Sequence, residues 1–205
     1  MRHEFSDSAK GFSDMRVLDE DLMERCRKGD MSAFELIVLR YKDAIFSFIY
    51  RFLMDYHRAQ DISQETFIRV LKNVNRYKSR NNFKTWLYRI AVNLCKNELR
   101  YRSRHKMLSL DDPTVDIESL AGNHFVPPDK AYEKKEMRKL VKDAVSELPE
   151  DQRMVIIMRE YQDLSYEEIA SALNCSLGAV KSKIYRARQN IKNMLLEAEI
   201  HKVAL

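Results

Sequence analysis

Apolar residues recur at steps of three and four along most of this 205-residue chain, and this is the period of an amphipathic helix. The widest apolar stripe runs through residues 32–54, and its width favours a helix inside a bundle. A short helix is expected before it, in residues 19–28, with acids in its first turn and Gly29 as its stop. Two more stripes predict helices in residues 59–74 and 83–101.

Periodicity and composition both change between residues 107 and 129, where prolines appear and acids replace bases. Helical stripes return in residues 130–148, where Met137 is expected to point inward, and again in residues 149–161. We therefore predict an all-α fold of two small helical domains joined by a flexible acidic linker. The predicted limits are 1–17 for a mobile tail, 18–106 for the first domain, 107–129 for the linker and 130–198 for the second domain.

The end of the second domain has the pattern of a helix-turn-helix. Ser165 and Glu168 form a predicted capping box that starts one short helix, and Ser176 is placed to cap the next. Residues 176–196 contain no acid, and the apolar stripe of this helix directs its polar side chains away from the core. These outward residues are Lys181, Ser182, Tyr185, Arg186, Arg188, Gln189 and Lys192. A major groove admits such a helix, so the face predicts contact with duplex DNA; a helical hairpin with a solvated basic face is the alternative.

The net charge is only +5, but the basic residues are concentrated. Residues 66–106 contain twelve Lys or Arg and one acid, Glu98, and aromatic rings alternate with the cations. Single-stranded nucleic acid needs both groups, because cations contact phosphates and rings stack on exposed bases. The pattern therefore favours a second nucleic-acid surface, in which Trp86 is either a stacking surface or a core anchor. The alternative is a helical protein with unevenly charged, solvated faces.

The sequence has no pattern typical of an enzyme. Its five His are scattered, no glycine-rich phosphate loop is present, and Cys26, Cys95 and Cys175 lack metal-ligand spacing. We therefore expect no catalytic residue, no cofactor and no metal. The first residues lack the apolar core of a signal peptide, and no apolar run reaches the length of a membrane span. These observations lead us to expect a cytoplasmic protein without direct membrane insertion.

Two motifs occur in the order AQDISQETF with FKTWLYRIAVNLCKNELR, and then ELPEDQRMVIIMREYQDLSYEEIASALNCSLGAVKSKIYRAR. Together they strongly resemble bacterial sigma factors of the extracytoplasmic-function (ECF, group IV) class of the sigma-70 family, over about residues 19–196. The resemblance implies a dissociable initiation subunit of bacterial RNA polymerase. Residues 18–106 then correspond to sigma region 2, and residues 130–198 to sigma region 4. The expected activity is recognition of a −35 duplex with melting and capture of a −10 element.

The resemblance also implies three sets of contact residues. Docking on the clamp helices of the largest polymerase subunit is expected from Asp61, Gln64, Glu65 and Phe67. Capture of the −10 element is expected from Tyr77, Lys78, Arg80, Asn81, Asn82, Phe83, Lys84, Trp86, Arg89, Asn93, Lys96 and Arg100. Contact with the −35 element is expected from Ser176, Lys181, Ser182, Lys183, Tyr185, Arg186, Arg188, Gln189 and Lys192.

The partners implied in the same way are core RNA polymerase, including the flap of its second-largest subunit, promoter DNA and an anti-sigma factor. Anti-sigma factors of this class are often membrane-anchored. A stand-alone helix-turn-helix transcriptional regulator is the alternative function. This alternative explains residues 130–196, but it does not explain the basic and aromatic segment 75–104.

Overall fold

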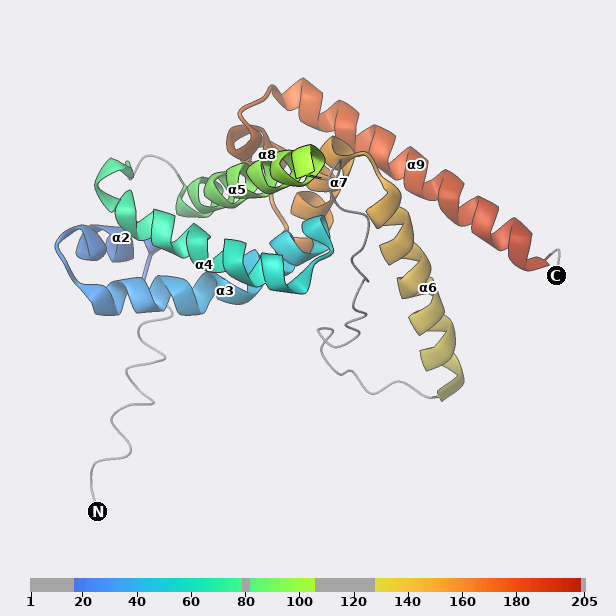
Figure 1. Cartoon of the computed structure of the whole chain (residues 1–205), viewed down its shortest axis with the longest axis horizontal. Helices are drawn as coiled ribbons and strands as arrows, with labels where there is room; N and C mark the ends of the chain where they lie inside the picture. Colours follow the sequence, from blue (N-terminus) through green and yellow to red (C-terminus); the bar gives the residue numbers. More distant parts are fainter. Residues whose placement is uncertain (1–16, 79–81, 106–127, 204–205) are drawn as a thin grey trace, which may run out of the picture.

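The computed structural model describes residues 17–78, 82–105 and 128–203, and within these ranges every element is a helix, which confirms the predicted all-α fold (Figure 1). In chain order the elements are α2 (Asp19–Arg27), α3 (Met31–Leu53), α4 (Tyr56–Lys72), the 3₁₀ turn η1 (Val74–Arg76), α5 (Phe83–His105), α6 (Pro128–Glu147), α7 (Glu150–Ile156), the π-helical turn η2 (Ile157–Tyr161), α8 (Tyr166–Leu173) and α9 (Leu177–Val203). We call α2–α5 the first lobe and α6–α9 the second lobe. No helix in the described ranges is long and apolar enough to cross a membrane.

Several sequence-based expectations fall on residues that the structure does not describe. They concern residues 1–16 of the predicted tail, residues 107–127 of the predicted linker, and the predicted contact residues Arg80 and Asn81. Helix α6 begins at Pro128, two residues before the predicted start of the second domain.

Residues at the helix ends explain where the helices of the first lobe begin and stop. Asp30 caps α3 by accepting hydrogen bonds from two backbone amides, at 3.0 and 3.3 Å. Gly29, the predicted stop of α2, has a φ of +90°, which a glycine adopts without strain. Asp55 caps α4 through a backbone amide at 2.9 Å. Helix α4 therefore begins at Tyr56, three residues before the start that the apolar stripe predicted.

The wide apolar stripe of α3 is the centre of the first lobe, because α2, α4 and α5 all pack against this helix. Ile45, Phe48 and Ile49 on α3 are completely buried. Tyr88 of α5 meets Phe48 edge to face, with ring centroids 5.4 Å apart. This confirms that the stripe in residues 32–54 belongs to the core.

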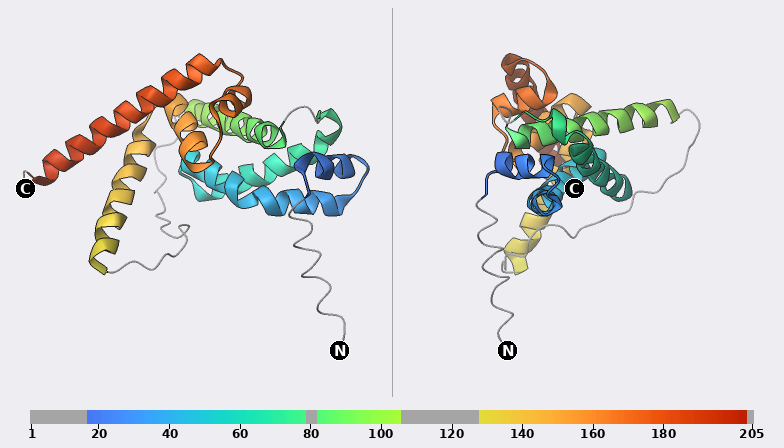
Figure 2. Two further views of the ribbon diagram at one scale, coloured as in Figure 1. Left: turned by 180° about the vertical axis from the view of Figure 1, so that it is seen from behind. Right: turned by 90° about the vertical axis from the view of Figure 1, so that its left-hand side faces the viewer.

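In the second lobe, α9 provides the surface on which α6, α7 and α8 pack. Val180, Ile184 and Ala187 of its apolar stripe are buried, as predicted. The expectation that Met137 points inward was wrong, because its side chain is 47% exposed. Helices α6 and α9 meet near α7 and diverge beyond it, so the start of α6 lies away from the rest of the lobe (Figures 1 and 2).

The two lobes pack directly against each other. Helix α5 packs against α8, and α3 contacts η2 (Figure 1). The Arg51 guanidinium stands over the Tyr161 ring at 4.1 Å, and that of Arg153 stands over the Phe52 ring at 5.4 Å. Buried apolar side chains of both lobes form one continuous cluster. Helix α8 therefore covers part of α5 and limits the surface of α5 that a ligand can reach.

Candidate nucleic-acid and protein-docking surfaces

The predicted docking residues lie on α4. Asp61 and Glu65 are one turn apart on the same side of the helix, and Gln64 is exposed beside them. The Asp61 side chain is 65% exposed, whereas Glu65 accepts a hydrogen bond from Nε of Arg69 at 2.7 Å. Phe67 is buried and belongs to the hydrophobic core, so it does not present its side chain beside these groups. We call Asp61, Gln64 and Glu65 the acidic patch.

Three rings from the predicted −10 set pack together at the start of α5. The Tyr77 centroid lies 5.1 Å from that of Trp86 and 5.9 Å from that of Phe83. Tyr77 and Phe83 are buried, and burial raises the pKa of Tyr77 to about 12. Trp86 is only half-buried, so it packs on the core and still presents an exposed edge. Of the three rings, Trp86 is the one available to a base in this arrangement.

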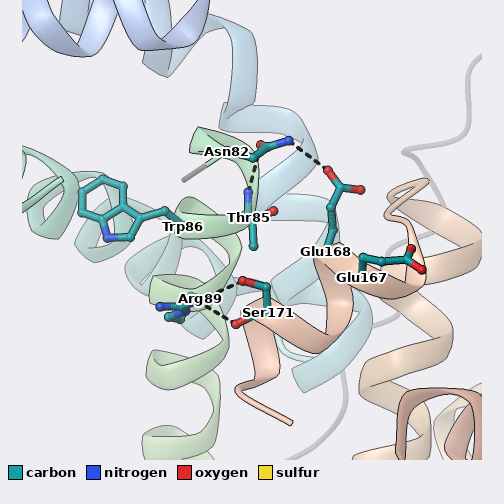
Figure 3. Close-up of a pocket in the computed structure, with 7 residues that line it drawn as sticks. All are labelled: Asn82, Thr85, Trp86, Arg89, Glu167, Glu168 and Ser171. Atoms are coloured by element: carbon teal, nitrogen blue, oxygen red, sulfur yellow. Dashed lines mark hydrogen bonds between the residues drawn. The ribbon is translucent and has the colours of Figure 1, made fainter. Parts of the chain in front are cut away.

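The polar members of the −10 set divide into an open group and a covered group. The open group is exposed and consists of Lys78, Asn93, Lys96 and Arg100. The covered group lies at the start of α5 and is hydrogen-bonded to the second lobe (Figure 3). Lys84 Nζ donates to the backbone carbonyl of Gln162 at 2.9 Å, and Nη2 of Arg89 donates to the carbonyl and hydroxyl of Ser171 at 2.8 and 3.1 Å.

A pocket of about 260 Å³ opens between α5 and α8 at this boundary (Figure 3). Its lining residues are Asn82, Thr85, Trp86, Arg89, Glu167, Glu168 and Ser171. The Asn82 amide donates to Glu168 across the boundary at 3.1 Å. Three residues of the predicted −10 set, Asn82, Lys84 and Arg89, therefore bond to the second lobe in this structure.

A buried hydrogen bond between the lobes accompanies these contacts. The Tyr88 hydroxyl donates to Oε1 of Gln162 at 2.7 Å, and both side chains are buried. Burial raises the pKa of Tyr88 far above its ordinary range, so the hydroxyl stays protonated and remains a donor. Because the two groups satisfy each other, both can be buried between the lobes without the cost of an unpaired polar group.

The predicted helix-turn-helix is present. Glu168 accepts from the Ser165 amide at 2.7 Å while the Ser165 hydroxyl accepts from the Glu168 amide at 3.1 Å, which confirms the predicted capping box. Helix α8 ends at Leu173, and the φ of 52° at the following Asn174 is left-handed and turns the chain. The Ser176 hydroxyl then accepts from the Ala179 amide at 3.2 Å and caps α9, as predicted.

The outward face of α9 carries the predicted −35 set. The exposed members are Ser176, Lys181, Ser182, Tyr185, Arg186, Arg188, Gln189 and Lys192, while Lys183 is half-buried. Two of the cations are paired within the lobe: Lys183 with Asp151 at 3.4 Å and Arg188 with Glu160 at 2.7 Å. The hydrogen bond with Glu160 raises the pKa of Arg188. Lys181, Ser182, Tyr185 and Arg186 carry no such ion pair with the described residues.

One polar cluster of the first lobe was not predicted. Glu98 of α5 is 7% exposed and accepts hydrogen bonds from Arg58 and Arg102, and Arg102 also donates to Asp55 at 2.6 Å. The available signal was that Glu98 is the single acid among residues 66–106. The pairing of Tyr88 with Gln162 had no comparable signal, because it depends on how the lobes pack.

Comparisons with known proteins agree with this arrangement. Residues 37–105 match the model of Sigma-70 region 2, and residues 138–191 match that of Sigma-70, region 4. The RNA polymerase sigma-H factor of Pseudomonas aeruginosa is 39% identical over 181 residues, which cover 86% of this chain and 93% of that protein. The ECF RNA polymerase sigma-E factor of Escherichia coli K12 is 36% identical over 187 residues, with 87% and 94% coverage.

Two solved structures have a similar fold. CnrH in complex with the cytosolic domain of CnrY has a TM-score of 0.65 at 23% identity and covers 88% of this chain and 97% of that chain. The sigma factor RpoE in complex with the anti-sigma factor NepR from Bartonella quintana also has a TM-score of 0.65, at 25% identity, with 79% and 96% coverage. From the two matched regions and the relatives of nearly equal length, this chain belongs to the ECF class of the sigma-70 family of RNA polymerase sigma factors.

Proposed function

We propose that this protein docks on core RNA polymerase as a dissociable subunit and directs initiation to promoters with matching −10 and −35 elements. It contributes binding and brings no catalytic group of its own. The observation that carries the proposal is the combination of an acid-free helix-turn-helix face on α9 with a basic, aromatic α5 in a separate lobe. A stand-alone regulator would need only the first of these, so we do not favour it.

The two surfaces have different tasks in this proposal. Helix α9 enters a major groove at −35, where Lys181, Tyr185 and Arg186 contact base edges and Lys192 contacts phosphate. Helix α5 holds the melted −10 strand, for which Lys96 and Arg100 supply cations and Trp86 a stacking surface. The acidic patch on α4 docks on a cationic surface of the polymerase.

Because α5 packs directly against α8 of the helix-turn-helix, we expect that the packed lobes do not contact both elements at once. Elements centred near −10 and −35 are about 25 base pairs apart, or about 85 Å of B-DNA. Helix α9, with 27 residues, is only about 40 Å long. The 22 residues between His105 and Pro128 can span about 70 Å when extended, which is sufficient to let the lobes move apart. We therefore expect weak promoter binding by the free protein and tight, specific binding on core polymerase.

The test is run-off transcription of genomic fragments with purified core polymerase and this protein. Initiation at discrete sites is expected, and its absence at every site would refute the proposal. In parallel, Asp61→Arg is expected to abolish co-purification with core polymerase while the helical content stays unchanged. Asp43→Arg, at an exposed acid of α3, is the matched control and should co-purify normally.

An anti-sigma factor is a further proposed partner. The related RpoE was solved in complex with NepR, which supports a protein inhibitor for the present chain as well. A pull-down from unstressed cells should then recover such an inhibitor along with core polymerase. Recovery of core polymerase alone would count against this partner.

A further inference from the structure

Glu98 has no role in the function proposed above, although it is an acid within a helix otherwise suited to binding an anion. Its carboxylate is almost completely buried between α4 and α5. Arg58 reaches it from the start of α4 with two donors, Nε at 3.1 Å and Nη2 at 2.5 Å. Nε of Arg102 adds a third hydrogen bond, at 2.9 Å. Such forked contacts between a guanidinium and a carboxylate are among the strong hydrogen bonds of proteins.

Arg58 also lies next to the acidic patch. Its Nη1 is 3.4 Å from Oδ2 of Asp61, three residues along the same helix. This contact is long and solvent-exposed, whereas the contact with Glu98 is forked and partly buried. A third acid, Asp55, is already engaged as the cap of α4 and as an acceptor from Arg102. Arg58 thus contacts both Glu98 and Asp61, and its contact with Glu98 is the stronger of the two.

Arg58 contacts Glu98 more strongly than Asp61 because the Glu98 carboxyl is ionised. The hydrogen bonds from Arg58, more than any other cause, lower the pKa of Glu98, so the carboxyl is charged at neutral pH. Without that charge, the nearest free carboxylate for Arg58 is Asp61, one helical turn away. A guanidinium closed onto Asp61 would neutralise the most exposed carboxylate of the acidic patch and occupy its oxygens.

We propose that Glu98 is a positioning residue, which keeps Arg58 away from Asp61 and so leaves the Asp61 carboxylate available to a cationic partner surface. The proposal rests on the docking role assigned to the acidic patch under the proposed function. It gives a buried acid of the DNA-facing helix a task in protein docking, carried out through an arginine of the neighbouring helix.

The test compares Glu98→Gln, Arg58→Gln and the double variant for binding to immobilised core polymerase by surface plasmon resonance at low salt. Glu98→Gln is expected to weaken binding about two- to five-fold, the range for an exposed ion pair, and the loss should shrink as salt is added. Adding Arg58→Gln should restore the affinity, because nothing is then left to cover Asp61. A purely structural role predicts the opposite, since the double variant loses more of the cluster than either single variant.

The matched control is Arg102→Gln, which removes a hydrogen bond from Glu98 but leaves Arg58 in place, and it should bind like the wild type. Thermal unfolding of each variant separates lost docking from lost folding. If Glu98→Gln does not fold, Arg58→Gln alone still decides: binding equal to or tighter than wild type supports the proposal, and weaker binding overturns it. If the wild type binds core polymerase but Glu98→Gln binds it equally well, this inference alone is overturned. The same holds if Glu98→Gln binds more weakly and the double variant does not recover the affinity. A wild type that does not bind core polymerase overturns the proposed function together with it.

Discussion

Arg186 and Arg188 are two positions apart on α9 and differ in what they already contact. Arg188 donates to Glu160 at 2.7 Å, so it must give up or share that pair before it can contact DNA. Arg186 is exposed and has no ion pair with the described residues, so its fork of donors is available. We therefore expect Arg186 to read a base edge and Arg188 to contact phosphate.

Arg186→Ala should cost about 1–3 kcal/mol of promoter binding by the holoenzyme and relax the preference at one −35 position. The measurement is the affinity for a set of promoters that carry each base in turn across the −35 element. Arg188→Ala, as the comparison, should weaken binding about equally on all of them. Uniform weakening by Arg186→Ala would assign Arg186 to phosphate as well.

Glu98 makes the stability of the first lobe depend on pH in a defined direction. Its pKa is lowered in the folded protein from an ordinary value of 4.5, so its contribution is complete above that pH and is lost as pH falls through the folded pKa. The difference in free energy of unfolding between wild type and Glu98→Gln should therefore be largest near neutral pH and shrink below pH 4.5. Urea unfolding at several pH values measures it. A difference that does not change with pH would mean that the charge of Glu98 is unimportant for stability.

Among the helices, the elements with local signals were the ones predicted well. The capping box at Ser165, the stop at Gly29 and the buried stripe of α9 are visible in residues close together in sequence, and all three are present. The start of α4 was missed because Asp55 caps polar residues that precede the apolar stripe. The wrong orientation of Met137 has another cause: periodicity identifies an apolar face without indicating whether another helix covers it.

Ser165→Ala should destabilise the second lobe by about 1 kcal/mol, because it removes one half of the capping box of α8. Urea unfolding followed by circular dichroism measures this loss. Ser103→Ala, at an exposed position within α5, is the control and should be close to neutral. Equal stability of Ser165→Ala and wild type would show that packing alone holds α8.

At the scale of the whole molecule, the outward face of α9 could be predicted from the sequence, but the spatial arrangement of the −10 set could not. The α9 face follows from one helix and its stripe. The −10 set does not: Lys84 and Arg89 are engaged with Gln162 and Ser171, residues about 80 positions away in the chain. No local pattern encodes a contact between two lobes, so the covering of α5 by α8 was found only in the structure.

Gln162→Ala should shift the free protein toward separated lobes. It leaves the buried Tyr88 hydroxyl without its acceptor, at a cost of about 1–3 kcal/mol that separation relieves, or roughly 5- to 150-fold in the equilibrium. Small-angle X-ray scattering should then show a larger radius of gyration. The double change Tyr88→Phe with Gln162→Ala removes both polar groups and should recover part of the compact form.

Gln152→Ala is the matched control, because that amide accepts from Asn190 at 2.9 Å inside the second lobe. It should leave the radius of gyration unchanged. If Gln162→Ala also leaves it unchanged, the buried pair does not hold the lobes together.

Trp86 is the only tryptophan in the chain, and it stands at the boundary between the lobes (Figure 3). The indole emission of the protein therefore comes from one place, a residue that lines the pocket together with Glu167, Glu168 and Ser171 of α8. If α8 moves away, the part of Trp86 that lines the pocket opens to bulk water, and the emission maximum should move to longer wavelength. The unlabelled free protein thus carries its own optical reporter of whether its two halves are together or apart.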